Sequence, residues 1–157
     1  MPVAVAPRGF ATHAEPRFAR ATCAFRADRG SGDVLRRTTE ICAAAGAEVR
    51  IATFGVRGKT MYPPEVRGEQ DVLDSFVEQA ESALREAAAA TGLSDVEHVV
   101  ATGQDWAEAV GRLSWRHDDV LVLGSSPRGL LARVFIGSHA GRIIRHSPVP
   151  VVVVPES

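Results

Sequence analysis

The sequence contains few of the residues on which several common classes of site depend. Its 157 residues include only two cysteines, Cys23 and Cys42, too few for a disulfide framework and too far apart for a CxxC motif. Charge of one sign is not in excess either, because 18 basic residues stand against 19 acidic ones and the formal net charge is −1. No overall field therefore attracts nucleic acid or an anionic membrane, and we expect neither as a partner.

Long hydrophobic runs are also missing. No apolar stretch reaches the roughly 18 residues of a membrane-spanning helix, and the N-terminus lacks the basic region and apolar core of a signal peptide. We therefore expect a soluble, cytoplasmic chain. Cys23 falls in a predicted strand and Cys42 on the apolar side of a predicted helix, so we interpret both as small buried hydrophobes. A redox pair stays open if the fold brings the two thiols together.

From Arg20 onward, predicted strands alternate with predicted helices. Short apolar runs predict strands at Arg20–Arg26, Glu48–Phe54, Val96–Ala101, Val120–Leu123 and Val151–Val154. Apolar residues at three- and four-residue spacing predict helices over 31–45, 69–90 and 105–116, with a last helix opened by Gly137 and Ser138. Ser31 or Asp33 is expected to cap the first helix, and Gly46 to end it. The alternation predicts an α/β fold: an open, twisted, parallel sheet of five strands with helices on both faces.

Residues 1–19 do not fit this alternation, but they contain a repeat. Pro2–Pro7 (PVAVAP) aligns without gaps on Pro150–Pro155 (PVVVVP). Two origins of this repeat stay open. Either it is a chance similarity, or residues 1–10 are the closing strand of a preceding domain of the same kind and residues 11–18 are the linker. On the second interpretation residues 1–19 are the remnant of that domain, residues 20–157 form the domain proper, and the chain is the second half of a tandem protein.

The stretch from Asp119 to Pro155 contains the parts of a phosphate cradle. A buried strand runs into a glycine turn, and a helix begins after a loop. Backbone N–H groups in such a turn and at a helix start can bind phosphate oxygens beyond the carboxyl ends of parallel strands. The candidate binding residues are Gly124, Ser125, Ser126, Arg128, Gly137 and Ser138, with Arg26 and Asp28 from the turn after the first strand.

This stretch resembles the C-terminal signature of the universal stress protein family: Gly, two residues, Gly, nine residues, then Gly-Ser or Gly-Thr. Gly124, Gly137 and Ser138 are in register with it. The resemblance covers residues 20–155 and implies a Rossmann-like fold of the adenine nucleotide alpha hydrolase type, a role in the stress response, and ATP as the ligand of some members. It also implies a homodimer through the strand Val151–Val154, a place for which Val3–Ala6 would compete.

Two departures from the family pattern argue against ATP. In the ATP-binding members an aspartate that contacts the nucleotide ends the first strand, whereas here Arg26 has that place and Asp28 comes two residues later. Pro127 replaces the second glycine of the signature; it has no N–H, and its φ is fixed near −65°. Losing one charge-assisted hydrogen bond costs about 1.5–3 kcal/mol. Three outcomes stay open: ATP binding of the family type, binding of another anion through side chains, and no ligand.

No catalytic residues and no metal site are expected. The sequence has no Walker motif, no Gly-x-Ser-x-Gly elbow and no third ligand beside His139 and His146. The leading interpretation is therefore a non-catalytic, dimerising regulatory domain with a degenerate nucleotide or anion site. The alternative is an ATP-binding member with weak nucleotide hydrolase activity that uses Asp28 and Asp105. A third interpretation is an interaction domain cut from a larger polypeptide.

Overall fold

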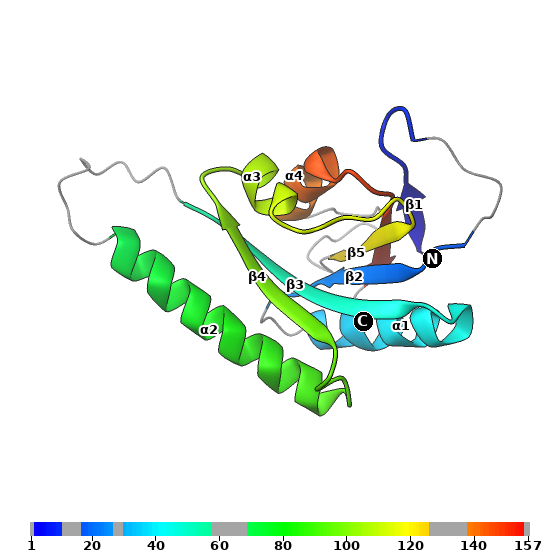
Figure 1. The fold of residues 1–157 in the computed structure, drawn as a ribbon, viewed down its shortest axis with the longest axis horizontal. Helices are drawn as coiled ribbons and strands as arrows, with labels where there is room; N and C mark the ends of the chain where they lie inside the picture. The colour runs from blue at the N-terminus through cyan, green and yellow to red at the C-terminus, as the bar shows by residue number, and fades with distance from the viewer. Residues whose placement is uncertain (1, 11–16, 27–29, 58–68, 126–137, 156–157) are drawn as a thin grey trace, which may run out of the picture.

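The computed structural model describes residues 2–10, 17–26, 30–57, 69–125 and 138–155, and of 69–72 and 138 the backbone alone. Ten elements follow one another along this part of the chain (Figure 1). They are β1 (Val3–Val5), β2 (Arg20–Ala24), α1 (Ser31–Ala45), β3 (Glu48–Val56), α2 (Glu69–Ala90), β4 (Glu97–Gly103), α3 (Trp106–Gly111), β5 (Asp119–Ser125), α4 (Ser138–His146) and β6 (Val151–Pro155). The alternation that the sequence predicts is confirmed.

The strands form one sheet in the order β1-β6-β5-β2-β3-β4. Strands β2 to β6 pair in parallel, as expected for strands joined by helices. The sheet has six strands rather than the predicted five, because the N-terminal repeat segment adds β1 antiparallel to β6. The described residues contain no helix that is long and apolar enough to cross a membrane.

Helices cover both faces of the sheet, α1 and α2 on one and α3 and α4 on the other (Figure 1). The period of two along the strands makes this possible, since alternate side chains enter opposite layers. In β2, for example, Ala21 and Cys23 join the core under α1 and α2, whereas Ala24 packs in the layer of α3 and α4. Both cysteines are buried and free, as predicted.

The end of α1 forms as its sequence predicts, but its start does not. Gly46 adopts φ 66°, and its N–H bonds the carbonyl of Cys42, a left-handed helix end that glycine adopts without strain. The predicted cap is wrong, because the N-cap position is Gly30, which has no side chain to accept a bond from the first turn. The hydroxyl of Ser31 is instead hydrogen bonded to the backbone of Arg26.

The third helix is shorter than predicted, ending at Gly111 instead of Arg116. Side-chain donors occupy backbone carbonyls that a longer helix would use, and two of these donors come from distant strands. The carbonyl of Val110 accepts a bond from the indole N–H of Trp115, and the carbonyl of Ser114 accepts bonds from the side chains of Arg20 and Arg50. Propensity along the sequence does not reveal such long-range partners.

Candidate functional site

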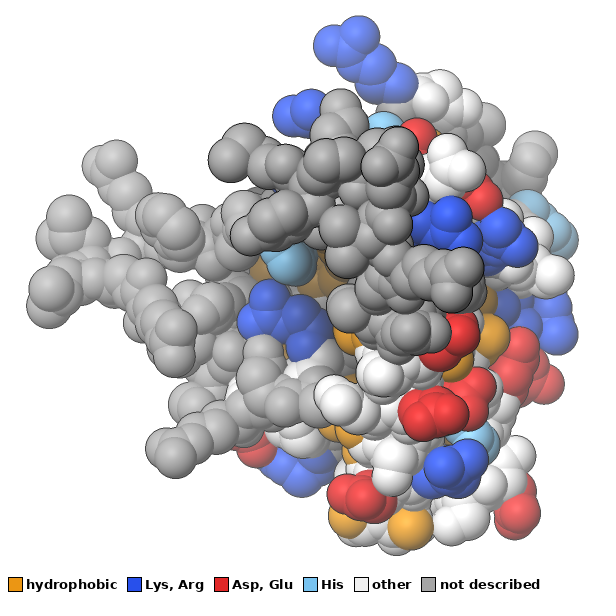
Figure 2. Space-filling model, turned by 90° about the vertical axis from the view of Figure 1, so that its left-hand side faces the viewer, with side chains coloured by type: hydrophobic (Ala, Val, Ile, Leu, Met, Phe, Trp, Pro, Cys, Tyr) orange, Lys and Arg blue, Asp and Glu red, His pale blue; other side chains and the backbone are white. Residues whose placement is uncertain are grey.

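The carboxyl ends of β2, β3, β4 and β5 meet at one edge of the sheet, which we call the rim. Figure 2 looks onto this edge, where basic and histidine side chains reach the surface. Ligands of open parallel sheets bind at such an edge. Four of the predicted residues are described there at least in part: Arg26, Gly124, Ser125 and Ser138. The other four predicted residues, Asp28, Ser126, Arg128 and Gly137, lie outside the described residues, as does Pro127.

Arg26 follows β2, and Ser125 is the last residue of the neighbouring strand β5. β2 and β5 are paired in parallel up to Cys23 and Val122, and each of the two rim residues comes three positions after that pair. Arg26 is exposed and Ser125 is half-buried beside Pro155 of β6. The structure therefore brings a cation and a hydroxyl-bearing residue to the same part of the rim, where the sequence predicted an anion site.

A pair of hydrogen bonds joins Arg26, just after β2, to Ser31 at the start of α1. The amide of Arg26 donates to Oγ of Ser31 at 3.1 Å, and that hydroxyl donates back to the carbonyl of Arg26 at 2.9 Å. Ser31 is itself buried. The backbone at Arg26 is therefore tied to the first turn of α1.

The start of α3 supplies the next stretch of the rim. Oδ1 of Asp105 accepts a bond from the amide of Glu108 at 2.8 Å, and Oε2 of Glu108 accepts one from the amide of Gln104 at 2.9 Å. These reciprocal bonds form a variant of the capping box. The bond from Gln104 and the adjacent Arg112 hold the pKa of Glu108 below its ordinary value. Asp105, which the enzyme alternative needs as a base or metal ligand, serves here as a helix cap.

Trp106 and His139 join the first turns of α3 and α4. Their ring centroids are 5.3 Å apart and the planes are inclined at 53°. Trp106 is buried and His139 exposed, and the indole Nε1 of Trp106 is a buried donor that has no hydrogen-bond partner among the described residues. The helix predicted over 105–116 includes Trp106, but nothing in the sequence pairs this residue with His139. Because the contact crosses two helices, no periodicity could have indicated it.

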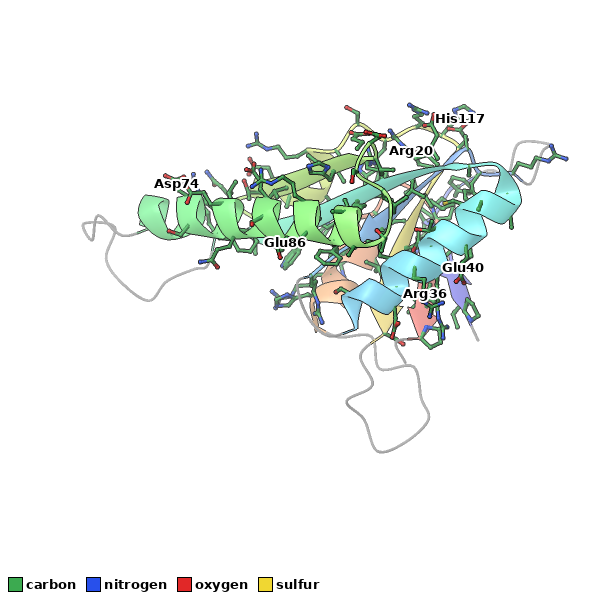
Figure 3. The ribbon with its side chains drawn as sticks, turned by 90° about the horizontal axis from the view of Figure 1, so that it is seen from below. Arg20, Arg36, Glu40, Asp74, Glu86 and His117 are labelled. Carbon is green, nitrogen blue, oxygen red and sulfur yellow. The ribbon has the colours of Figure 1, made fainter. Side chains whose placement is uncertain are left out.

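A buried charge cluster lies at the opposite edge, where the strands begin. Arg20 donates two hydrogen bonds to Asp119, at 3.0 Å and 2.6 Å, and Figure 3 shows Arg20 at the same end of the sheet as His117. Arg50 donates to Thr22 Oγ1 at 3.0 Å and lies 4.9 Å from the ring centre of Trp115. We call Arg20, Arg50 and Asp119 the buried charge cluster.

The charges of this cluster influence one another. Burial by itself would raise the pKa of Asp119, but hydrogen bonds from Arg20 and from the amide of Arg116 outweigh it and lower that pKa. The same pairing raises the pKa of Arg20. Burial, together with repulsion from Arg20, lowers the pKa of Arg50. The cluster is remote from the rim and holds the connection between α3 and β5, so we assign it to stability. None of the residues predicted as candidate site residues belongs to this cluster.

A comparison with protein families identifies the chain. The model of the universal stress protein family matches residues 18–155. Universal stress proteins of Mycobacterium tuberculosis and Mycobacterium bovis are each 43% identical over 158 residues, covering 99% of this chain and 54% of theirs. The chain thus spans about half the length of these curated relatives.

Solved structures share the fold. The universal stress protein UspA from Lactobacillus plantarum has a TM-score of 0.67 at 16% identity, covering 91% of this chain and 100% of that one. A universal stress protein solved in complex with cAMP has a TM-score of 0.52 at 22% identity, covering 90% and 99%. These two likenesses concern the fold alone. The family model and the mycobacterial relatives together show that this chain belongs to the universal stress protein family.

Proposed function

We propose that the chain is a non-catalytic, cytoplasmic regulatory domain that binds a nucleotide or another phosphate-bearing anion at the rim. The observation that carries the proposal is the placement of exposed Arg26 and half-buried Ser125 at the carboxyl ends of neighbouring parallel strands. An exposed guanidinium binds phosphate oxygens through charge-assisted hydrogen bonds. The universal stress protein solved with cAMP supports a phosphate-bearing ligand for this fold.

We propose that the domain is non-catalytic because the described rim lacks a carboxylate placed to act as a base or metal ligand. Hydrolysis of a nucleotide needs a general base or metal ligands near the phosphates. The described rim has Arg26 where relatives that bind ATP are expected to have aspartate, and the Asp105 carboxylate is engaged by the amide of Glu108. These two features favour ligand sensing over the alternative of a weak hydrolase.

A thermal-shift titration tests the ligand proposal. ATP, ADP, AMP, cAMP and inorganic phosphate are titrated against the parent chain, Pro127→Gly, Arg26→Gln and Arg36→Gln. Pro127→Gly restores a backbone donor and is expected to tighten binding about tenfold to a hundredfold. Arg26→Gln is expected to weaken it.

Arg36→Gln is the matched control for Arg26→Gln. Arg36 is an exposed arginine on α1 that pairs with Glu40 at 2.9 Å, so its loss removes the same charge outside the rim (Figure 3). Equal effects of the two arginine variants would mean that general charge attracts the anion. The absence of any shift with all five compounds, in the parent chain and in Pro127→Gly alike, would contradict the ligand proposal.

We further propose that the domain acts as a homodimer whose contact is the β6 edge, through Val151–Val154. Support comes from the strand itself: without β1, β6 would be the edge of the sheet, and an apolar, uncharged edge strand favours pairing with another chain. In this chain β1 lies against that edge. A complete homodimer contact at β6 therefore requires that β1 move away.

A further inference from the structure

β1 and β6 pair in a register that has a two-fold symmetry of its own. The aligned residues are Val3 with Val153, Ala4 with Val152 and Val5 with Val151. Pro2–Pro7 repeats Pro150–Pro155 at a constant offset, which makes Ala4 the counterpart of Val152. The central residue of the pair thus faces its own counterpart, and the residues on either side exchange places.

This is the arrangement that two copies of one strand adopt about a two-fold axis. In such a contact residue i of one copy meets residue j of the other, and j meets i. If β6 met β6 of another chain about an axis at Val152, then Val151 would face Val153 and Val152 would face Val152. β1 reproduces that register within a single chain.

β1 is weakly held in this place. The strand has three residues, all of them exposed, and Val3 and Val5 each keep 37% of their surface in solvent. β6 has five residues, three of them buried. A second β6 would therefore offer a longer ladder, with valine in place of Ala4 at the centre of the cross-strand contacts.

We propose that β1 is a built-in substitute for the closing strand of a second copy of this chain, and that its release exposes β6 for two-fold pairing centred on Val152. This inference rests on the proposed dimer at β6, and it adds the register and the segment that blocks the contact. As part of the same chain, β1 competes at an effective concentration of roughly millimolar, so it prevails when the protein is dilute.

Deletion of residues 2–10 tests the release of β6. By sedimentation velocity at about 10 µM, the parent chain is expected at its monomer mass of 16.7 kDa. The truncated chain is expected at about double its own monomer mass. A truncated chain that is folded by circular dichroism and stays monomeric up to about ten times that concentration would overturn the inference.

A charge at Val152 tests the register. In the truncated chain, Val152→Lys and Val152→Glu each place like charges opposite one another at the two-fold axis, so each variant alone is expected to be monomeric. An equal mixture is expected to recover the doubled mass. In the parent chain Val152→Lys faces Ala4 and is the matched control for folding. A truncated dimer that Val152→Lys leaves unchanged uses another surface, which would overturn the inference.

Ala4→Pro in the parent chain covers the case in which the truncated chain precipitates. Proline cannot donate a backbone hydrogen bond and is depleted in strands, so it disfavours β1 without shortening the chain. The variant is expected to dimerise, and Val152→Lys is expected to abolish that dimer as well. A folded monomer of Ala4→Pro would overturn the inference. The inference would also fail if both the truncated chain and Ala4→Pro precipitated and mixing their Val152→Lys and Val152→Glu forms did not restore solubility. Titration of the same samples with nucleotides keeps the outcomes apart, because binding by a monomeric truncated chain would leave the ligand proposal standing.

Discussion

Arg20 and Asp119 form a bidentate ion pair between the first residues of β2 and β5, and both side chains are withdrawn from solvent. Asp119→Ala is expected to lower the free energy of unfolding by about 3–5 kcal/mol, because it leaves two buried guanidinium groups without their carboxylate. Urea titration measures the change. Glu97→Gln is the control: its carboxylate is 57% exposed and 3.5 Å from Arg20, so a loss under about 1 kcal/mol is expected. Equal losses would contradict the assignment of stability to the buried pair.

Stability should also depend on pH through Asp119. Its pKa in the folded state is lowered, so the stability it contributes is present above its unfolded value of about 3.9 and is lost as pH falls through the folded value. The free energy of unfolding, measured in urea between pH 6 and pH 2.5, is expected to decline below about pH 5. Asp119→Asn should show a shallower decline in that window. An identical slope in both proteins would show that other carboxylates account for the acid sensitivity.

Gly103 allows α3 to approach the end of β4. A Cβ at this position would lie 2.6 Å from the backbone nitrogen of Ala109 and 2.8 Å from Cβ of Glu108. Gly103→Ala is therefore expected to destabilise the protein by about 1–3 kcal/mol, since backbone must move. Gly141→Ala is the control, because no atom of the described residues lies within 4 Å of its added Cβ in the interior of α4. That variant should gain about 0.5–1 kcal/mol. Thermal unfolding compares the two variants.

Variants of Asp105 distinguish its role as a helix cap from a role in catalysis. Asp105→Ala is expected to lose about 1 kcal/mol of stability, whereas Asp105→Asn keeps an acceptor for the amide of Glu108 and should lose little. Phosphate release from ATP with magnesium is expected to be at background in the parent chain and in both variants. Turnover by the parent chain that disappears in the correctly folded Asp105→Asn would instead establish the weak hydrolase.

The sequence by itself determined the order of the elements from β2 to β6. The information is local: apolar residues at periods of 2 and 3.6, and Gly46 at a helix end where φ is positive. It also placed the rim, because alternating strands and helices make a parallel sheet whose carboxyl ends share one edge. Gly124, Ser125 and Arg26 could be assigned to that edge for this reason.

Only the tertiary structure decided which of these residues meet. The early end of α3 depends on Ser114, whose carbonyl is taken by two arginines from distant strands. The sequence revealed the repeat of Pro2–Pro7. Only the tertiary structure shows that β1 runs antiparallel to β6 and that Ala4 pairs with Val152. The direction and register of a strand depend on all of its contacts with residues far away in the sequence, and a local pattern of residues does not specify those contacts.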